Sequence, residues 1–117
     1  MKRLLFLLVS AFTLLAADAT GKWTGTLTPD GGGDGPAYLV LKQEGTKLTG
    51  TAGPGEGQQT PIENGKVDGA NITFELPAGG SVMKFVLKQE GEEIKGDISR
   101  ERDGQKQTAK LAVKREK

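Results

Sequence analysis

The most constraining feature of the sequence is an internal repeat. The chain carries LVLKQEGTKLTGT at 39–51 and FVLKQEGEEIKGD at 85–97, an offset of 46 residues. Each copy has an alternating apolar and polar run, a Glu-Gly pair and a second alternating run, which is the pattern of a β-hairpin. A chain that uses one hairpin design twice is predicted to build a sheet from successive hairpins.

The rest of the chain after residue 19 shows no helical periodicity. Short alternating runs are separated by Gly, Asp-Gly, Asn-Gly and Pro, which are typical of tight turns. Strands joined by such short connections pair with their neighbours in sequence and run up and down. The pattern predicts eight strands, at 21–28, 36–44, 47–52, 60–68, 71–77, 81–90, 93–101 and 106–115.

The strand count and the composition favour a closed barrel. Only 35% of the residues are hydrophobic and 18 are glycine, so a sheet must use each apolar side chain efficiently. With an even number of strands the last can pair antiparallel with the first, and closure removes both sheet edges. We therefore predict an all-β fold, an eight-stranded antiparallel up-and-down barrel, with a two-sheet β-sandwich of the same strands as the alternative.

Alternation of side chains along each strand predicts which residues face the interior. Inward glycines at 25, 50 and 96 either leave room for a ligand or only permit tight coiling of the sheet. Four apolar residues are predicted to point outward instead: Tyr38, Val40, Val82 and Val86. The candidate ligand-contacting residues of the interior are Trp23, Leu39, Leu41, Phe74, Phe85 and Leu87.

The predicted strand 60–68 breaks the alternation, because Ile62 and Val67 have opposite parity. A β-bulge at Asn64-Gly65 would restore the phase by one residue. A two-residue hairpin turn at the same dipeptide would add a strand instead. The bulge is the preferred interpretation.

The first nineteen residues are predicted to be a signal peptide. Lys2 and Arg3 precede an apolar run over 4–17, and Ala17-Asp18-Ala19 supplies small residues at the two positions that a signal peptidase reads. The run is shorter than the ~20 residues of a membrane-spanning helix, so a retained anchor is the disfavoured alternative. We expect cleavage after Ala19, which leaves a single domain, 20–117, exported to the periplasm or the medium, without a membrane span.

The composition excludes several function classes. Histidine and cysteine are absent, which removes the commonest general base, the thiol nucleophile and nearly every zinc or copper site. Without the predicted signal peptide, basic and acidic residues are equal in number, so the strong positive field of a nucleic-acid binder is missing. The loop with Asp30 and Asp34 lacks the oxygen spacing of an EF-hand. We predict a protein that is not an enzyme, with no catalytic residue, no cofactor, no metal and no nucleic-acid partner.

Barrel closure brings the two ends of the chain together. The first strand begins near Trp23, and an antiparallel last strand ends beside it, near Arg115. If Leu111 and Val113 face inward, so does Arg115. A guanidinium lying on the indole would plug one barrel end as a structural pair, worth ~1–2 kcal/mol when desolvated.

GKW at 21–23, with the basic residue that closes LAVKREK at 111–117, resembles the signature of the calycins, the lipocalin and avidin barrels. The wider layout, GKWTGT, LVLKQEGTKLTGT and GKVDGANITFEL, also resembles small secreted bacterial domains of no settled function. The calycin resemblance implies binding of a small molecule inside the barrel. Biotin is not expected, because the avidin site is walled by several tryptophans and this chain has only Trp23.

Two functions remain open at this point. The first is a binding module for a small apolar ligand within the barrel. The second is a structural or interaction domain with a filled core, which binds a protein or envelope partner through its surface; the sequence does not identify that partner. An internal cavity above ~300 Å³ would favour the first, and a packed interior the second.

Overall fold

A computed structural model describes residues 18–102 and 104–116 of the chain. Within these residues the protein forms nine strands and no helix. They are β1 (Gly21–Pro29), β2 (Gly35–Glu44), β3 (Lys47–Gly55), β4 (Gln58–Pro61), β5 (Glu63–Asp68), β6 (Asn71–Ala78), β7 (Ser81–Glu90), β8 (Glu93–Arg102) and β9 (Gln105–Arg115).

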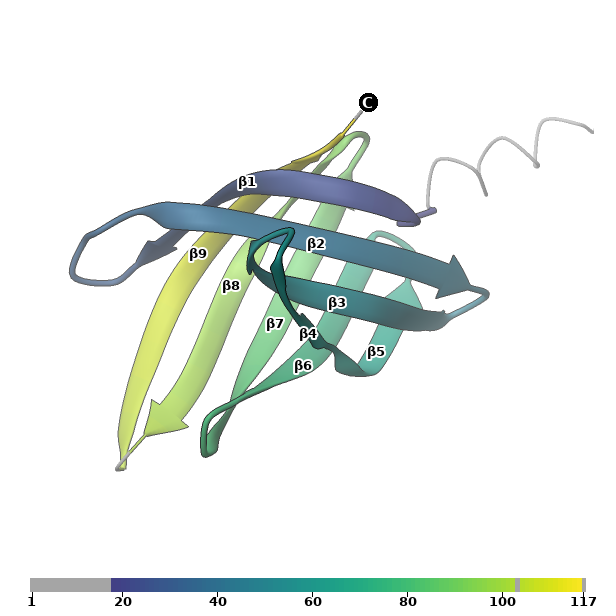
Figure 1. Ribbon diagram of the computed structural model, residues 1–117. Helices are drawn as coiled ribbons and strands as arrows, with labels where there is room; N and C mark the ends of the chain where they lie inside the picture. Colours follow the sequence, from purple (N-terminus) through teal and green to yellow (C-terminus); the bar gives the residue numbers. More distant parts are fainter. Residues whose placement is uncertain (1–17, 103, 117) are drawn as a thin grey trace, which may run out of the picture.

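Eight of these strands close into an antiparallel barrel (Figure 1). Each strand pairs with its neighbour from β5 to β9, then β9 pairs with β1, β1 with β2, and β2 with β3. The ring is closed by β3 and β5 through the residue pairs Lys47–Lys66 and Leu48–Gly65. The predicted eight-stranded up-and-down barrel is confirmed, and the sandwich alternative is wrong. One extra strand, β4, is added to β3 outside the ring.

The predicted strand 60–68 is the part of the fold that needs correction. It is two strands, because β4 ends at Pro61 and β5 begins at Glu63. The β3 strand continues beyond the predicted residue 52 as far as Gly55, and a turn at Glu56-Gly57 leads into β4. This additional hairpin carries polar residues, glycine and proline rather than an apolar alternation, so the sequence pattern did not predict it.

The preferred bulge at Asn64-Gly65 is confirmed. The register of β5 against β6 shifts between Glu63 and Lys66, and Asn64 has φ 54°, the left-handed conformation that asparagine tolerates. Gly65 is required for a different reason. A Cβ atom there would lie 2.1 Å from the carbonyl oxygen of Leu48 on β3, across the seam that closes the barrel.

The core contains Trp23 and the stacked rings of Phe74 and Phe85, whose centroids are 4.4 Å apart. Trp23, Ile72 and Ile94 are completely shielded from solvent. The six residues predicted to contact a ligand in the interior are all buried, with exposed fractions of 4% or less.

The inward glycines do not leave room for a ligand. A Cβ atom at Gly25 would lie 1.9 Å from the carbonyl oxygen of Ala112, and one at Gly50 would lie 1.9 Å from that of Val40. At Gly96 the corresponding oxygen, of Val86, is 2.3 Å away. These glycines therefore let neighbouring strands approach each other closely, which favours the interpretation that they permit tight coiling.

Of the apolar residues predicted to point outward, Val82 and Val86 are 44% and 61% exposed. Tyr38 differs, because it is only 7% exposed. The β3–β4 hairpin provides the cover. The Tyr38 hydroxyl donates to Glu56 Oε2 at 3.3 Å, and Gln59 Nε2 donates to the Tyr38 carbonyl at 3.1 Å. Lys22 on β1 lies 3.8 Å from the same Glu56 carboxylate. The extra hairpin is thus attached to the outside of β1 and β2.

Burial raises the pKa of Tyr38 above 10.0, and the charges of Glu116 and Glu56 and the hydrogen bond to Glu56 raise it further. The stabilising effect of the neutral phenol is complete below about pH 10, the ordinary pKa of tyrosine. It is lost as the pH rises through the higher pKa of the folded protein. Because Tyr38 is the one tyrosine of the chain, its titration can be followed directly by ultraviolet absorbance.

We expect Glu56→Gln to move this titration toward the ordinary tyrosine pKa, and Glu101→Gln, on the outside of β8, to leave it in place. A Tyr38 pKa at or below the ordinary value would contradict the arrangement of the hairpin.

Candidate functional site at the open end of the barrel

One end of the barrel is sealed by the two chain segments that meet there. Trp23 pairs with Arg115 in the β1–β9 register, and the Arg115 guanidinium carbon lies 4.4 Å from the centroid of the Trp23 ring. Arg115 Nε also donates to Glu92 Oε1 at 3.1 Å. The Trp23 indole N–H donates to the carbonyl oxygen of Ala19 at 3.0 Å, and Ala19 is itself 0% exposed. These described residues cover the interior at this end.

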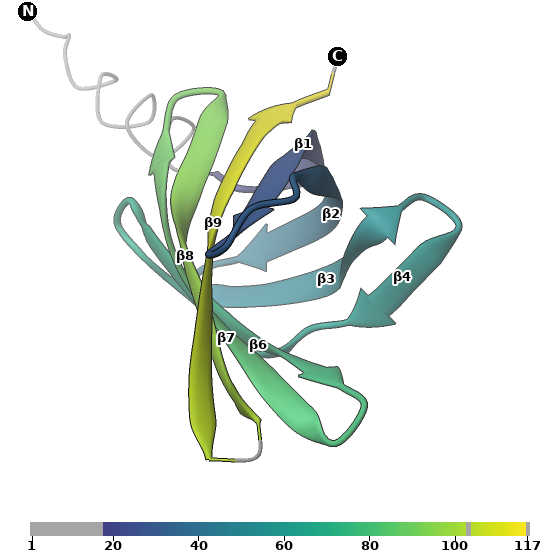
Figure 2. The same ribbon diagram turned by 90° about the vertical axis from the view of Figure 1, so that its left-hand side faces the viewer.

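The opposite end is hollow. Figure 2 shows the tips of the β6–β7 and β8–β9 hairpins at the end of the molecule away from the C-terminus. Between the strands at this open end lies a cavity of about 190 Å³ with an almost wholly apolar lining. Its walls include Leu27, Leu39, Leu76, Met83, Phe85 and Leu111.

A second hollow of about 180 Å³ adjoins the first and shares Leu27, Met83 and Ile98 with it. Here the lining becomes partly polar, with Arg100 and Gln107 on neighbouring strands. Arg100 Nε donates to Gln107 Oε1 at 2.8 Å. Among the described residues that line the two hollows, Arg100 is the one with a charged side chain. The open end thus combines an apolar floor with the Arg100 guanidinium at its rim.

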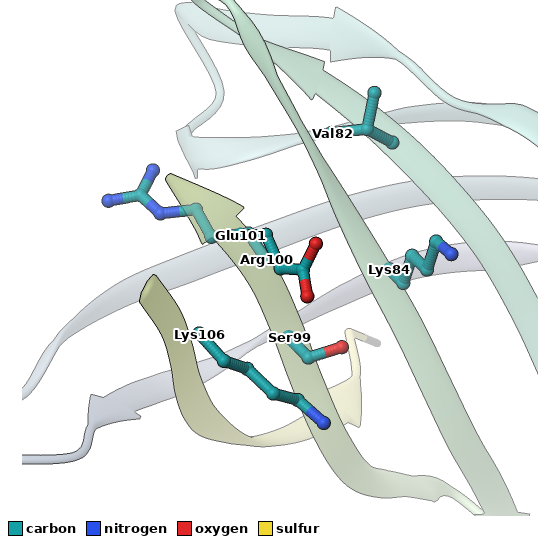
Figure 3. A pocket seen from close by; sticks show the side chains of 6 residues that line it. All are labelled: Val82, Lys84, Ser99, Arg100, Glu101 and Lys106. Carbon is teal, nitrogen blue, oxygen red and sulfur yellow. The ribbon is translucent and has the colours of Figure 1, made fainter. Parts of the chain in front are cut away.

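Another hollow, of about 490 Å³, lies on the outside of β7, β8 and β9 (Figure 3). Val82, Lys84, Glu101 and Lys106 line it with exposed side chains, and Ser99 and Arg100 complete its lining. Figure 3 shows the Arg100 guanidinium and the Glu101 carboxylate directed to opposite sides of β8. Solvated charges on a convex sheet surface form no enclosed site, so we do not treat this hollow as a candidate site.

The structure divides the predicted ligand-contacting residues between two environments. Leu39 and Phe85 line the open-end cavity, whereas Trp23, Leu41, Phe74 and Leu87 do not line it and are buried in the packed part of the core. The sequence did not single out the other cavity residues as a site, among them Leu27, Leu76, Met83, Ile98 and Leu111.

The described carboxylates are scattered over the barrel surface and its loops. Among residues 18–102 and 104–116, no group of three or more His, Cys, Asp or Glu side chains could hold an ion. Asp30, in the glycine-rich β1–β2 loop, instead accepts a hydrogen bond from the Thr108 hydroxyl, and its backbone N–H donates to the Thr108 carbonyl at 3.0 Å. Its carboxylate therefore fixes the loop to β9.

In the described part of the chain no helix has the length and apolar character needed to cross a membrane. Comparisons with protein-family models, with curated proteins and with solved structures find no match for this chain.

Proposed function

We propose that the protein is a non-catalytic, exported binding module that takes a small apolar molecule into the open end of its barrel. The supporting observation is the asymmetry of the two ends. One end is sealed by Trp23, Arg115 and Ala19, and the other keeps an apolar cavity that is accessible from outside. Covering apolar surface with a ligand is favourable by about 25 cal/mol per Å².

The size and charge of the site define the proposed ligand further. A cavity of about 190 Å³ is smaller than the ~300–1,000 Å³ of sites for drug-sized molecules, so the ligand is a small or narrow one. The neighbouring hollow extends the apolar surface to Arg100, whose guanidinium suits a carboxylate or another anionic group. We therefore favour a short-chain anionic amphiphile, with its chain in the cavity and its head group at Arg100.

The barrel and the stacking of Arg115 on Trp23 also support the proposed kinship with the calycins, in which a small ligand enters the barrel. The surface-binding alternative has less support. The large apolar side chains exposed among the described residues are Val82 and Val86 on β7, and the charged Lys84 lies between them in the sequence. Two such residues do not make the contiguous apolar patch of a partner site.

The first test uses two substitutions on one strand. We expect Met83→Asp to weaken binding of decanol at least tenfold, because Met83 is half-buried and lines both hollows. Val86→Asp, on the outer face of the same strand, is the matched control and should leave affinity unchanged. Calorimetric titration measures both. Failure of the unmodified protein to bind decanol, decanoate or decyltrimethylammonium would contradict the proposed function.

The second test concerns the head group. We expect decanoate to bind more tightly than decanol, and Arg100→Gln to remove most of that preference while leaving decanol binding intact. Lys84→Gln, on the outside of the barrel, removes an equal charge and serves as the control. If Arg100→Gln and Lys84→Gln lower decanoate affinity equally, general electrostatic attraction explains the preference and Arg100 has no special role. Native mass spectrometry of protein purified from its own host would then identify the natural ligand.

A further inference from the structure

The sealed end of the barrel holds the segment Asp18–Thr20 through its backbone. The Asp18 carbonyl oxygen accepts from Arg115 Nη2 at 2.9 Å and from Gln89 Nε2 at 3.2 Å. The Ala19 N–H donates to Gln43 Oε1 at 2.8 Å, and its carbonyl accepts from the Trp23 indole. Arg115 Nη1 donates to the Thr20 carbonyl. Contacts to three successive residues therefore attach this segment to the barrel.

The two glutamines in this network occupy equivalent positions of the internal repeat. Gln43 Nε2 donates to the carbonyl of Gly45 in its own turn at 3.0 Å, and Gln89 Nε2 donates to that of Gly91 at 3.2 Å. Each side chain therefore caps its hairpin and also contacts the N-terminal segment. The repeated hairpin thus supplies two polar side chains that hold one short peptide.

Cleavage after Ala19 would remove two residues that the fold uses. Ala19 is 0% exposed and belongs to the core cluster. Without Asp18 and Ala19, the Trp23 indole N–H and the Gln43 side-chain oxygen would lose the partners just described. Buried polar groups left without partners are costly, as is an emptied position in a packed core.

We infer that the folded domain includes Asp18 and Ala19 and that the leader is removed on the N-terminal side of Asp18, not after Ala19. The inference rests on the proposed export and is independent of the ligand. Cleavage after Ala17 or Ala16 still has a small residue at the cleaved position, and it places Leu15 or Leu14 at the second position that the peptidase reads. The network also leaves Gln89 Oε1 buried without a partner among the described residues. In a chain that begins at Asp18, the α-amino group of Asp18 is an ammonium group with additional N–H donors. The Gln89 amide already contacts Asp18, so these donors lie near the unpaired Gln89 Oε1.

The test is the intact mass of the protein after expression of the full chain in an exporting host. We expect a mature chain that retains Asp18 and Ala19. Ala19→Ser keeps a small residue for the peptidase and should raise the mature mass by one oxygen atom. A mature chain that begins at Thr20, with a mass unchanged by Ala19→Ser, would overturn the inference. An unprocessed full-length mass would overturn both this inference and the proposed export.

A stability measurement gives an independent reading on the same protein. We expect Ala19→Leu to lower the melting temperature of the purified protein by several degrees, because the enclosed alanine site has no space for the larger side chain. Lys88→Leu, at an exposed position of β7, is the control and should change it little. If the two variants melt alike, Ala19 is not part of the folded domain and the inference is wrong.

Discussion

Gly25→Ala is expected to lower the free energy of unfolding by about 3 kcal/mol or more, the upper part of the range for overpacked sites. The added Cβ would lie 1.9 Å from the carbonyl oxygen of Ala112 and 2.6 Å from the Cα atom of Val113. Both atoms belong to the β9 backbone, so no side-chain rotation relieves the collision. Relief requires separation of β1 from β9, the pairing that joins the first strand of the barrel to the last.

Gly35→Ala is the matched control for this prediction. Gly35 also lies in the barrel sheet, in β2, but a Cβ there meets nothing within 4 Å and its φ is not positive. We expect a change within about 0.5 kcal/mol, as at other unobstructed surface positions. Urea unfolding measures both variants, with an unchanged m-value showing that the comparison concerns stability alone. Equal destabilisation of the two would contradict the close contact of β1 and β9.

The barrel could be predicted from the sequence because the patterns that indicate it involve residues close together along the chain. The repeated hairpin at 39–51 and 85–97 sets the strand pattern, and side-chain alternation assigns each residue to a face without knowledge of its neighbours. The same parity argument located the bulge at Asn64-Gly65. Closure then followed from an even number of strands with short connections.

The β3–β4 hairpin was missed because contacts distant in sequence hold it. Its sequence, from Thr51 to Pro61, has no apolar alternation to indicate strands. Its attachment depends on Glu56 and Gln59, which bond to Tyr38 on another strand. Such contacts become visible only once β2 and β3 have been placed side by side.

The candidate site was predicted only in part for a related reason. Alternation shows which residues face inward but not how deep each lies along the barrel axis. That depth depends on which end is sealed, and here the seal is made by Ala19 and Arg115, near opposite ends of the chain. Leu39 and Phe85 therefore line the open cavity, whereas Leu41 and Leu87, two residues further along the same strands, do not.

Trp23→Ala is expected to cost about 3–5 kcal/mol, the usual loss when a buried large aromatic is truncated. Trp23 is completely shielded, donates its indole N–H to Ala19 and carries the Arg115 guanidinium on its ring. A domain of this size has a total stability of about 5–15 kcal/mol, so this loss is a large fraction of it. Denaturant unfolding followed by far-ultraviolet circular dichroism measures the change without relying on tryptophan fluorescence.

Trp23→Phe separates the cation–π contact from the hydrogen bond. Phenylalanine keeps an aromatic face for Arg115 but has no N–H to donate to the Ala19 carbonyl. We expect a smaller loss than for Trp23→Ala. In a double-mutant cycle, Arg115→Ala should cost more in the Trp23 protein than in the Trp23→Ala protein, since the cation–π contact exists only in the former. Amphiphile binding should be unchanged in Trp23→Phe, because the substitution lies at the sealed end and the cavity at the other. A loss of decanol binding in a stably folded Trp23→Phe protein would mean that the ligand reaches the packed half of the barrel, contrary to the proposed site.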